Sequence, residues 1–215
     1  MSNVSTGIRP GYDIEFAIST LSQEDPLLGT LIERIGPYGL NLRYIQSSFL
    51  SLLRAIVYQQ LSGKAAATIH GRLKALFEAE TPDPAALLGM PDEVLRTAGL
   101  SNAKTLAVKD LAAKVLDGTV PTMAELDAMD DEAIIESLIQ IRGIGRWTVE
   151  MLLIFSLGRP DILPVSDLGI RRGFMRTYQM KEMPTPGLVR SHGERWAPYR
   201  SVASWYLWRA SELTS

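Results

Sequence analysis

The chain of 215 residues contains no cysteine and only two histidines, His70 and His192. The absence of cysteine excludes disulfides, cysteine-ligated zinc, cysteine-ligated iron–sulfur clusters and a cysteine nucleophile. Two histidines also argue against a multi-histidine metal site. Long apolar runs are missing as well, because the densest one, at 49–58, is interrupted by Ser51 and Arg54. A membrane-spanning helix is therefore not expected.

The composition is that of an ordinary soluble globular protein. Hydrophobic residues make up 46% of the chain and charged residues 21%, a balance that does not suit a disordered chain. The length fits one large domain or two small subdomains that share a cleft. The start of the chain lacks the basic and then apolar pattern of a signal peptide, so we expect the protein to stay in the cytoplasm.

The net charge is −2, which argues against a strongly basic nucleic-acid binder, but the charge is unevenly distributed. Residues 1–139 carry 11 basic and 18 acidic side chains, a balance of −7. Residues 140–215 carry 11 basic and 6 acidic side chains, a balance of +5. An anionic partner would therefore meet the C-terminal third of the chain.

The apolar residues recur at spacings of three and four, as in amphipathic helices, and alternating strand patterns are nearly absent. Seven or more short helices joined by Gly/Pro turns predict an all-α protein. Prolines at 160–164 and 184–198 indicate some non-helical backbone after Leu157. The expected helices lie at 49–57 after Ser47 or Ser48, from Ser62 to about Phe77, between Pro91 and Gly99, at 101–116 before Gly118, from Asp130 or Asp131 to about Ile141, at 146–157, and within 195–213.

The segment 138–148 predicts a hairpin between two helices. One helix ends near Ile141, the glycines Gly143 and Gly145 flank Ile144 in a tight turn, and a second helix begins at once. The glycines allow unusual backbone angles and the close approach of a large group, while Ile144 can plug the core. The N–H groups at the start of the second helix would suit a phosphate. The simpler alternative is that the glycines only end one helix and complete a turn.

The same turn could hold a monovalent cation. The backbone carbonyls of Ile139, Ile141 and Gly143, at the end of the first helix, could bind Na⁺ or K⁺ and bridge it to a phosphate. No other cofactor is expected. Together with Arg146 and Thr148, the hairpin resembles a helix–hairpin–helix, which grips the DNA backbone without reading bases.

Four segments in order make the resemblance specific. After the hairpin come a Gly/Pro loop at 158–166, Asp167, and then Leu-Gly-Ile-Arg-Arg. This order resembles the helix–hairpin–helix DNA glycosylase superfamily. The segments Arg-Ala-Ile-Val-Tyr-Gln-Gln-Leu-Ser at 54–62, Gly-Leu-Ser-Asn-Ala-Lys at 99–104 and Gly-Ile-Gly-Arg-Trp-Thr at 143–148 are similar to the AlkA branch, the 3-methyladenine DNA glycosylase II enzymes. The chain is too short for the N-terminal β-rich domain of longer members.

The resemblance implies a catalytic role for Asp167. Breaking an N-glycosidic bond builds positive charge on the deoxyribose, which a fixed carboxylate can stabilise while it orients water toward C1′. Asp167 is also a good helix N-cap, and both roles can hold together. Asp161 is the rival carboxylate, and a turn residue is its other interpretation.

Position 147 predicts the type of reaction. Relatives that also cleave the DNA backbone carry a lysine just after the Gly-x-Gly-Arg element, and its amine forms a Schiff base with the sugar. This chain has Trp147 there, and no lysine lies between Lys114 and Lys181. We therefore expect a monofunctional glycosylase that leaves an abasic site. An indole face also attracts cationic alkylated bases such as 3-methyladenine and 7-methylguanine.

The resemblance assigns further residues to the contact with DNA. An extracted base leaves a hole in the stack that a side chain must fill, and Gln60, with Leu61 as its neighbour, matches the wedge of the family; a polar helix end is the alternative. Trp208 matches a pocket aromatic, with core packing as the alternative. Met151 and Leu168 stand where longer relatives have two other pocket aromatics. The groups expected to hold phosphates are Gly143, Gly145, Arg146, Thr148 and Lys104, with Arg171 as a further candidate. Each of the basic residues Lys104, Arg146 and Arg171 could equally be a solvated surface charge.

Our expectation is an all-α glycosylase of two helical subdomains with a central cleft. Residues 45–160 would form a helical barrel that ends in the hairpin, and residues 1–44 with 161–215 would form the other half. The partner would be double-stranded DNA with alkylated bases, including 1-methyladenine and 3-methylcytosine, bound by a monomer that is associated with the nucleoid if the source is bacterial. The alternatives are a non-catalytic helix–hairpin–helix DNA-binding protein and a glycosylase for oxidised or mismatched bases.

Overall fold

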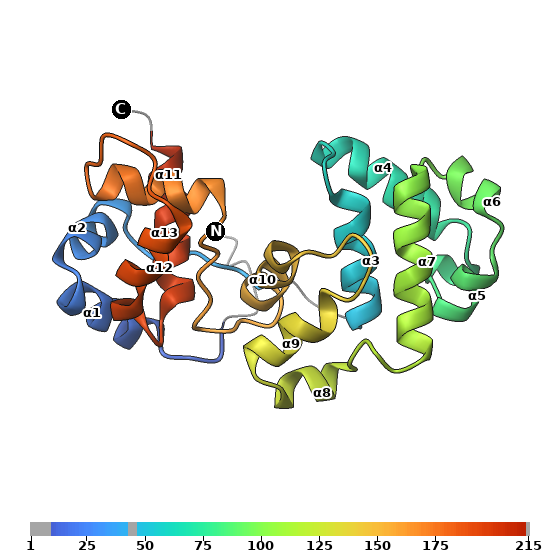
Figure 1. Ribbon diagram of the computed structural model, residues 1–215, viewed down its shortest axis with the longest axis horizontal. Coiled ribbons are helices and arrows are strands. Elements are labelled where there is room, and N and C mark those ends of the chain that lie inside the picture. The colour runs from blue at the N-terminus through green and yellow to red at the C-terminus, as the bar shows by residue number, and fades with distance from the viewer. Residues whose placement is uncertain (1–9, 43–46, 214–215) are drawn as a thin grey trace, which may run out of the picture. The chain divides into compact units, whose positions relative to one another are not determined.

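The computed structural model describes residues 10–42 and 47–213 (Figure 1). These residues fall into two compact units. The continuous unit holds residues 47–149, and the discontinuous unit holds residues 10–42 together with 150–213. The sequence places the end of the first subdomain at residue 160. In the structure, the chain passes from the continuous to the discontinuous unit between residues 149 and 150, within a helix.

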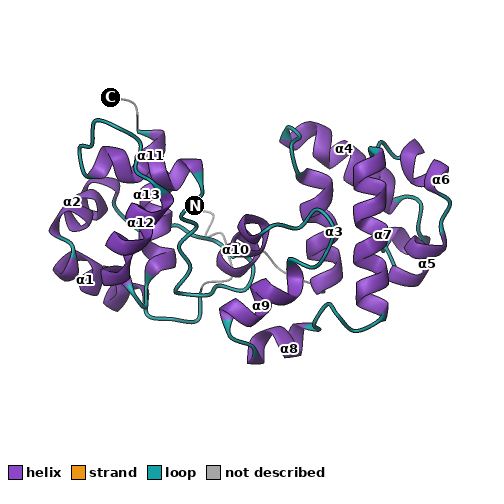
Figure 2. Ribbon diagram, viewed as in Figure 1, coloured by secondary structure: helices purple, strands orange, loops and turns teal. Residues whose placement is uncertain are grey.

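Helices account for all regular secondary structure of the described residues, as the sequence predicts, and no β-strand element is found among them (Figure 2). The helices of the discontinuous unit are α1 (Ile14–Glu24), α2 (Pro26–Ile35), α11 (Leu168–Thr177), α12 (Pro186–Gly193), η2 (Glu194–Trp196) and α13 (Arg200–Glu212). The helices of the continuous unit are α3 (Ser48–Tyr58), α4 (Gly63–Lys74), η1 (Glu78–Glu80), α5 (Pro84–Gly89), α6 (Asp92–Thr97), α7 (Asn102–Leu116), α8 (Met123–Ala128) and α9 (Asp131–Leu138). Helix α10 (Arg146–Phe155) contains the boundary between the units.

Side-chain caps fix where most of these helices begin. Ser47, Ser62, Ser101 and Asp130 each accept a hydrogen bond from the backbone N–H three residues later, which satisfies a donor that the helix leaves unpaired. These predicted starts are confirmed. The predicted ends are less accurate, because α4, α9 and α10 end at Lys74, Leu138 and Phe155, two or three residues early.

The core of the continuous unit forms around its longest helix, α7, which packs against α3, α5 and α6 (Figure 1). Helix α3 also packs against α4. The apolar stripe of α3 supplies Leu52, Leu53 and Ile56, each at most 1% exposed. This packing places the end of α3 and the loop after it beside the start of α7.

The discontinuous unit combines both ends of the described chain. Helix α13 packs against α11, α1 and α2, and its Tyr206 is fully buried and donates a hydrogen bond from its hydroxyl to the carbonyl of Gly36. Trp196 is also fully buried. In the described ranges, no helix is long and apolar enough to span a bilayer.

Candidate active site and nucleic-acid interface

The predicted hairpin is present between α9 and α10. Gly143 has a φ of 79°, a backbone conformation that costs a non-glycine residue energy. The N–H of Ile144 donates to the carbonyl of Ile141 at 3.0 Å, which closes the turn. Ile144 is only 4% exposed, so its side chain anchors the turn in the core as the sequence predicts.

Gly145 lies on the open side of this turn. Its carbonyl accepts from the N–H groups of Thr148 and Val149 at 2.9 and 3.3 Å, so it begins the hydrogen bonding of α10. Gly145 is exposed, and a Cβ added there would meet no atom within 4 Å in the described chain. A side-chain atom added at Gly145 would therefore extend into open space.

Arg146, a predicted phosphate contact, forms a two-pronged ion pair. Its Nη1 and Nη2 donate to the two carboxylate oxygens of Glu132, each at 2.7 Å. The hydrogen bond from Arg146 lowers the pKa of Glu132. Both side chains are about half exposed, so the pair lies in solvent and a phosphate would compete with Glu132 for the guanidinium.

The predicted wedge lies in the loop between α3 and α4. Gln60 is exposed and has a φ of 57°, an uncommon conformation for a residue other than glycine. Leu61 is 39% exposed, and Ser62 then caps α4. Strained, exposed residues of this kind are often found at functional sites.

Lys104 holds this loop in place. Its Nζ donates to the carbonyls of Val57 and Gln59 at 2.6 and 2.9 Å, at the C-terminal end of α3. Burial lowers the pKa of Lys104. This role was not predicted, and the phosphate contact of Lys104 stays a prediction.

Gln59 is a residue that the sequence analysis did not assign to the site. Its side-chain amide Nε2 donates to the carbonyl of Gly143 at 2.9 Å and lies 3.4 Å from Thr148 Oγ1. The loop with the wedge and the hairpin turn are therefore joined directly. Only its position next to Gln60 could have indicated this role, since its partners lie more than 80 residues away in the sequence.

Asp167 caps α11, as predicted, and its Oδ1 has a second partner. This oxygen accepts from the N–H of Ile170 and from Trp208 Nε1, both at 2.9 Å. The indole comes this close because residue 169 is glycine: a Cβ there would lie 2.8 Å from Trp208 Cδ1. Asp167 is half-buried. Two donors fix the direction of its carboxylate.

The rival carboxylate, Asp161, is held in an ion pair. Arg200 donates from Nε and Nη2 to the two oxygens of Asp161 at 2.6 and 2.7 Å. This pair fixes the Gly/Pro loop to the start of α13. Asp161 therefore has a structural role that a turn residue in sequence alone does not indicate.

The predicted pocket residues differ in exposure. Trp147 is 48% exposed and Leu168 is 55% exposed, whereas Met151 and Trp208 are half-buried. The Trp208 ring packs against Phe155, with 5.4 Å between ring centroids. Trp147 belongs to the continuous unit and the other pocket residues to the discontinuous unit. The hydrogen bond from its indole brings Trp208 to Asp167, and Leu168 follows Asp167 in the chain.

The carbonyls predicted to hold a cation are partly engaged. The Ile141 carbonyl accepts from the N–H of Ile144, and the Gly143 carbonyl accepts from Gln59 Nε2. Each keeps a second lone pair. Ile139 follows the last residue of α9 and keeps helical backbone angles. Binding of a monovalent cation by these carbonyls stays a prediction.

Arg171, the further phosphate candidate, donates from Nε to the carbonyl of Pro184 at 2.8 Å.

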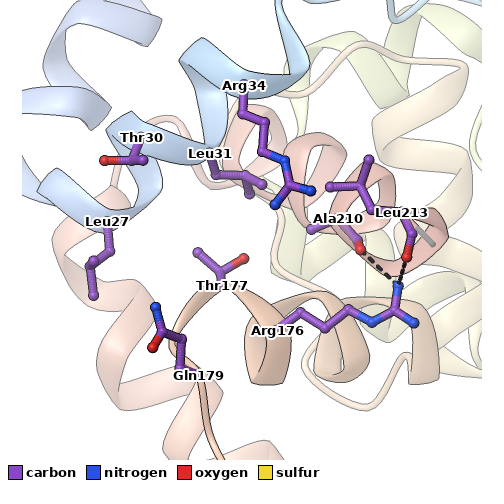
Figure 3. A pocket seen from close by; sticks show the side chains of 9 residues that line it. All are labelled: Leu27, Thr30, Leu31, Arg34, Arg176, Thr177, Gln179, Ala210 and Leu213. Carbon is purple, nitrogen blue, oxygen red and sulfur yellow. Dashed lines mark hydrogen bonds between the residues drawn. The ribbon is translucent and has the colours of Figure 1, made fainter. Parts of the chain in front are cut away.

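A separate pocket of about 300 Å³ opens in the discontinuous unit, where Arg34 and Arg176 point toward the same space (Figure 3). Arg176 also donates to the carbonyls of Ala210, Ser211 and Leu213 at the end of α13. None of the predicted site residues lines this pocket.

Comparisons with known proteins agree on one family. The family model described as "HhH-GPD superfamily base excision DNA repair protein" matches residues 53–198. DNA-3-methyladenine glycosylase 1 of Schizosaccharomyces pombe is 40% identical over 185 residues, which cover 85% of this chain and 81% of that protein. A solved structure of the 3-methyladenine DNA glycosylase of this yeast, in complex with abasic-DNA, has a TM-score of 0.81 and 39% identity, covering 93% of this chain and 98% of that one. A DNA-3-methyladenine glycosidase of Bacillus halodurans has a TM-score of 0.83 and 38% identity, covering 91% and 89%.

Proposed function

This chain belongs to the HhH-GPD superfamily of base excision DNA repair proteins, and from that premise we propose that it is a monofunctional DNA glycosylase for alkylated bases. Its substrates are 3-methyladenine and 7-methylguanine in duplex DNA, with 1-methyladenine and 3-methylcytosine as further candidates. The reaction is hydrolysis of the N-glycosidic bond. The observation that carries the proposal is the carboxylate of Asp167, oriented by two donors after the hairpin and the Gly/Pro loop.

Asp167 acts by its charge. As the glycosidic bond breaks, positive charge builds on the deoxyribose, and a carboxylate in a fixed direction stabilises it without reorganising. The Ile170 N–H and the Trp208 indole hold Oδ1 in one direction. The same carboxylate can orient a water molecule toward C1′. An alkylated base that is cationic leaves readily, so little acid catalysis is needed.

The residue after Arg146 makes the enzyme monofunctional. A lyase needs an amine at this position for a Schiff base with the sugar. Trp147 cannot form one, and its exposed indole instead offers a face to a cationic base. Trp208, Met151 and Leu168, all in the discontinuous unit, are further proposed contacts of the base, and Trp208 also positions Asp167.

The hairpin and the wedge loop hold the DNA while the base is extracted. The open surface at Gly145 accepts a phosphate, and Na⁺ or K⁺ on the carbonyls of Ile139, Ile141 and Gly143 would neutralise part of its charge. Gln60, with Leu61 beside it, fills the hole that the extracted base leaves. The enzyme acts as a monomer, needs no other cofactor, and works in the cytoplasm, associated with the nucleoid if the source is bacterial.

The test is a release assay on duplex DNA treated with a methylating agent. We expect free 3-methyladenine and 7-methylguanine, separated by chromatography, and strands that stay intact until alkali cleaves the abasic sites. Nicking without alkali, or a borohydride-trapped complex of protein and DNA, would show that another amine acts as nucleophile.

The two alternative functions give different results in this assay. A glycosylase for oxidised or mismatched bases would leave methylated bases in place. It would instead release bases from control duplexes that carry an oxidised base or a mismatch. A non-catalytic DNA-binding protein would bind each duplex and release nothing. Either result contradicts the proposal.

A further inference from the structure

The loop that carries Gln60 and the turn that carries Gly145 are joined through a single side chain. Gln59 is the last residue before Gln60 and follows the end of α3. Its Nε2 donates to the carbonyl of Gly143 at 2.9 Å. The same nitrogen lies 3.4 Å from the hydroxyl of Thr148, in the first turn of α10. One amide group thus contacts both sides of the hairpin turn.

The backbone of Gln59 is held from the other side. Lys104, in the first turn of α7, donates from Nζ to the carbonyl of Gln59 at 2.9 Å and to that of Val57 at 2.6 Å. Both bonds tie the end of α3 to α7. Gln59 is therefore fixed at its carbonyl by Lys104 and at its side chain by the hairpin, and Gln60 follows directly from this fixed point.

We infer that Gln59 is a positioning residue that sets the wedge loop in register with the phosphate-binding turn. This inference rests on the proposed function. If Gln60 enters the base stack while the turn grips a phosphate, the spacing of the two contacts must match the spacing of the DNA. A misplacement of about 1 Å can cost on the order of 100-fold in rate. The link acts on base extraction, and the affinity for DNA backbone comes from the turn itself.

The test uses Gln59→Met, which keeps the length of the side chain and removes both donors. We expect binding to undamaged duplex to stay within about twofold, because phosphate contacts are unchanged. The single-turnover rate of base release should fall about 10-fold to 100-fold. The matched control is Gln23→Met, since the amide of Gln23 is exposed and donates only to Ser19 Oγ, at 3.3 Å, within α1.

A double-mutant cycle separates positioning from a general loss of structure. If Gln59 acts through the wedge, adding Gln59→Met to Gln60→Ala should lower the rate no further than Gln60→Ala alone. Two effects that multiply would overturn the inference. So would a Gln59→Met protein with the wild-type rate, or one that loses affinity for undamaged duplex as strongly as it loses rate.

A fluorescence measurement distinguishes failure of this inference from failure of the proposed function. A 2-aminopurine placed opposite an abasic-site analogue reports insertion of the wedge without any chemistry. Wild-type protein should change this fluorescence, and Gln59→Met should bind the same duplex with a much smaller change. If the wild type inserts but releases no alkylated base, the proposed function fails and the inference stands. If Gln59→Met does not fold, Gln59→Ala, which removes the link without placing a long apolar side chain there, should show the same separation of binding from release, and an unchanged rate there would contradict the inference.

Discussion

One carboxylate oxygen of Asp167 makes two structural hydrogen bonds, and the same carboxylate is the proposed catalytic group. Its Oδ1 accepts one hydrogen bond from the N–H of Ile170, which caps α11, and a second from the indole N–H of Trp208. An asparagine can present its carbonyl oxygen at the same place and keep both bonds. Charge at this position can therefore be separated from shape.

The change Asp167→Asn should lower the rate of base release by about 10²–10³ because the negative charge near the sugar is lost. Its melting temperature and its affinity for abasic DNA should stay close to those of the wild type. Excision kinetics, thermal unfolding and binding are measured on the same preparation. The matched change is Asp161→Asn, which breaks the pair with Arg200 and should lower stability while the chemical step persists. Near-normal release by folded Asp167→Asn would refute the catalytic assignment.

The sequence predicts individual site residues well when their signal is local. Asp167 can be identified as a cap from the next few residues, and Ile144 as a core plug from the glycines beside it. The partners of Lys104 and Arg146 lie 14 or more residues away, at carbonyls and a carboxylate that no local pattern indicates. Their basic side chains therefore suggest phosphate contacts, while the folded chain gives each a partner of its own.

The two glycines of the hairpin differ in what they contribute to this element. Gly143 has a positive φ and faces Ala107, whose Cβ would lie 3.4 Å from an added Cβ. Gly145 has open space in the same test. The first glycine is needed for the fold of the turn, and the second leaves room for a partner.

Gly145→Ala should fold with nearly wild-type stability and bind duplex DNA of every sequence more weakly, because the added methyl group occupies the space of the phosphate. Binding titrations over a series of salt concentrations, with thermal unfolding as the control, measure both effects. Wild-type affinity should fall steeply with salt despite the net charge of −2. Gly143→Ala should instead lower the melting temperature. Wild-type affinity in Gly145→Ala would show that this face of the turn does not meet DNA.

Helix starts are more predictable than helix ends in this chain. A start is marked by one side chain that accepts from a nearby N–H, as at Ser47, Ser62 and Ser101. An end depends on where tertiary packing stops, and the apolar residues after Lys74 and Leu138 continue the helical pattern without continuing the helix. Leu76 thus lies in a turn, and Phe77 and Ile141 lie in bends.

At the scale of the whole molecule, Asp25 connects distant parts of the discontinuous unit. It is 3% exposed and caps α2 with Oδ1. Its Oδ2 accepts from the Tyr178 hydroxyl at 2.5 Å, from His192 Nε2 at 2.9 Å and from Trp196 Nε1 at 3.0 Å. Burial opposes ionisation, but these hydrogen bonds outweigh it and lower the pKa of Asp25.

Asp25→Asn should destabilise the protein by at least about 2 kcal/mol, because one amide oxygen cannot accept from all four donors. Thermal unfolding over a range of pH measures this loss. Since the folded pKa of Asp25 is lowered, its contribution is present above the unfolded value of about 4 and is lost as pH falls through the folded value. The difference between wild type and Asp25→Asn should therefore shrink below about pH 4. A difference that stays constant down to acid pH would show that the charge of Asp25 does not contribute.

The discontinuous unit also constrains the order in which the protein can fold during synthesis. Helices α1 and α2 are made before residues 47–149, while α11 and α13, against which they pack, follow those residues. The continuous unit can fold as soon as its own residues have left the ribosome, since domains generally fold as units. The apolar faces of α1 and α2 must wait until most of the chain is translated. The apolar residues of α1 and α2 therefore stay exposed through most of translation. If the ribosome stalls, these exposed segments become targets for chaperones and proteases.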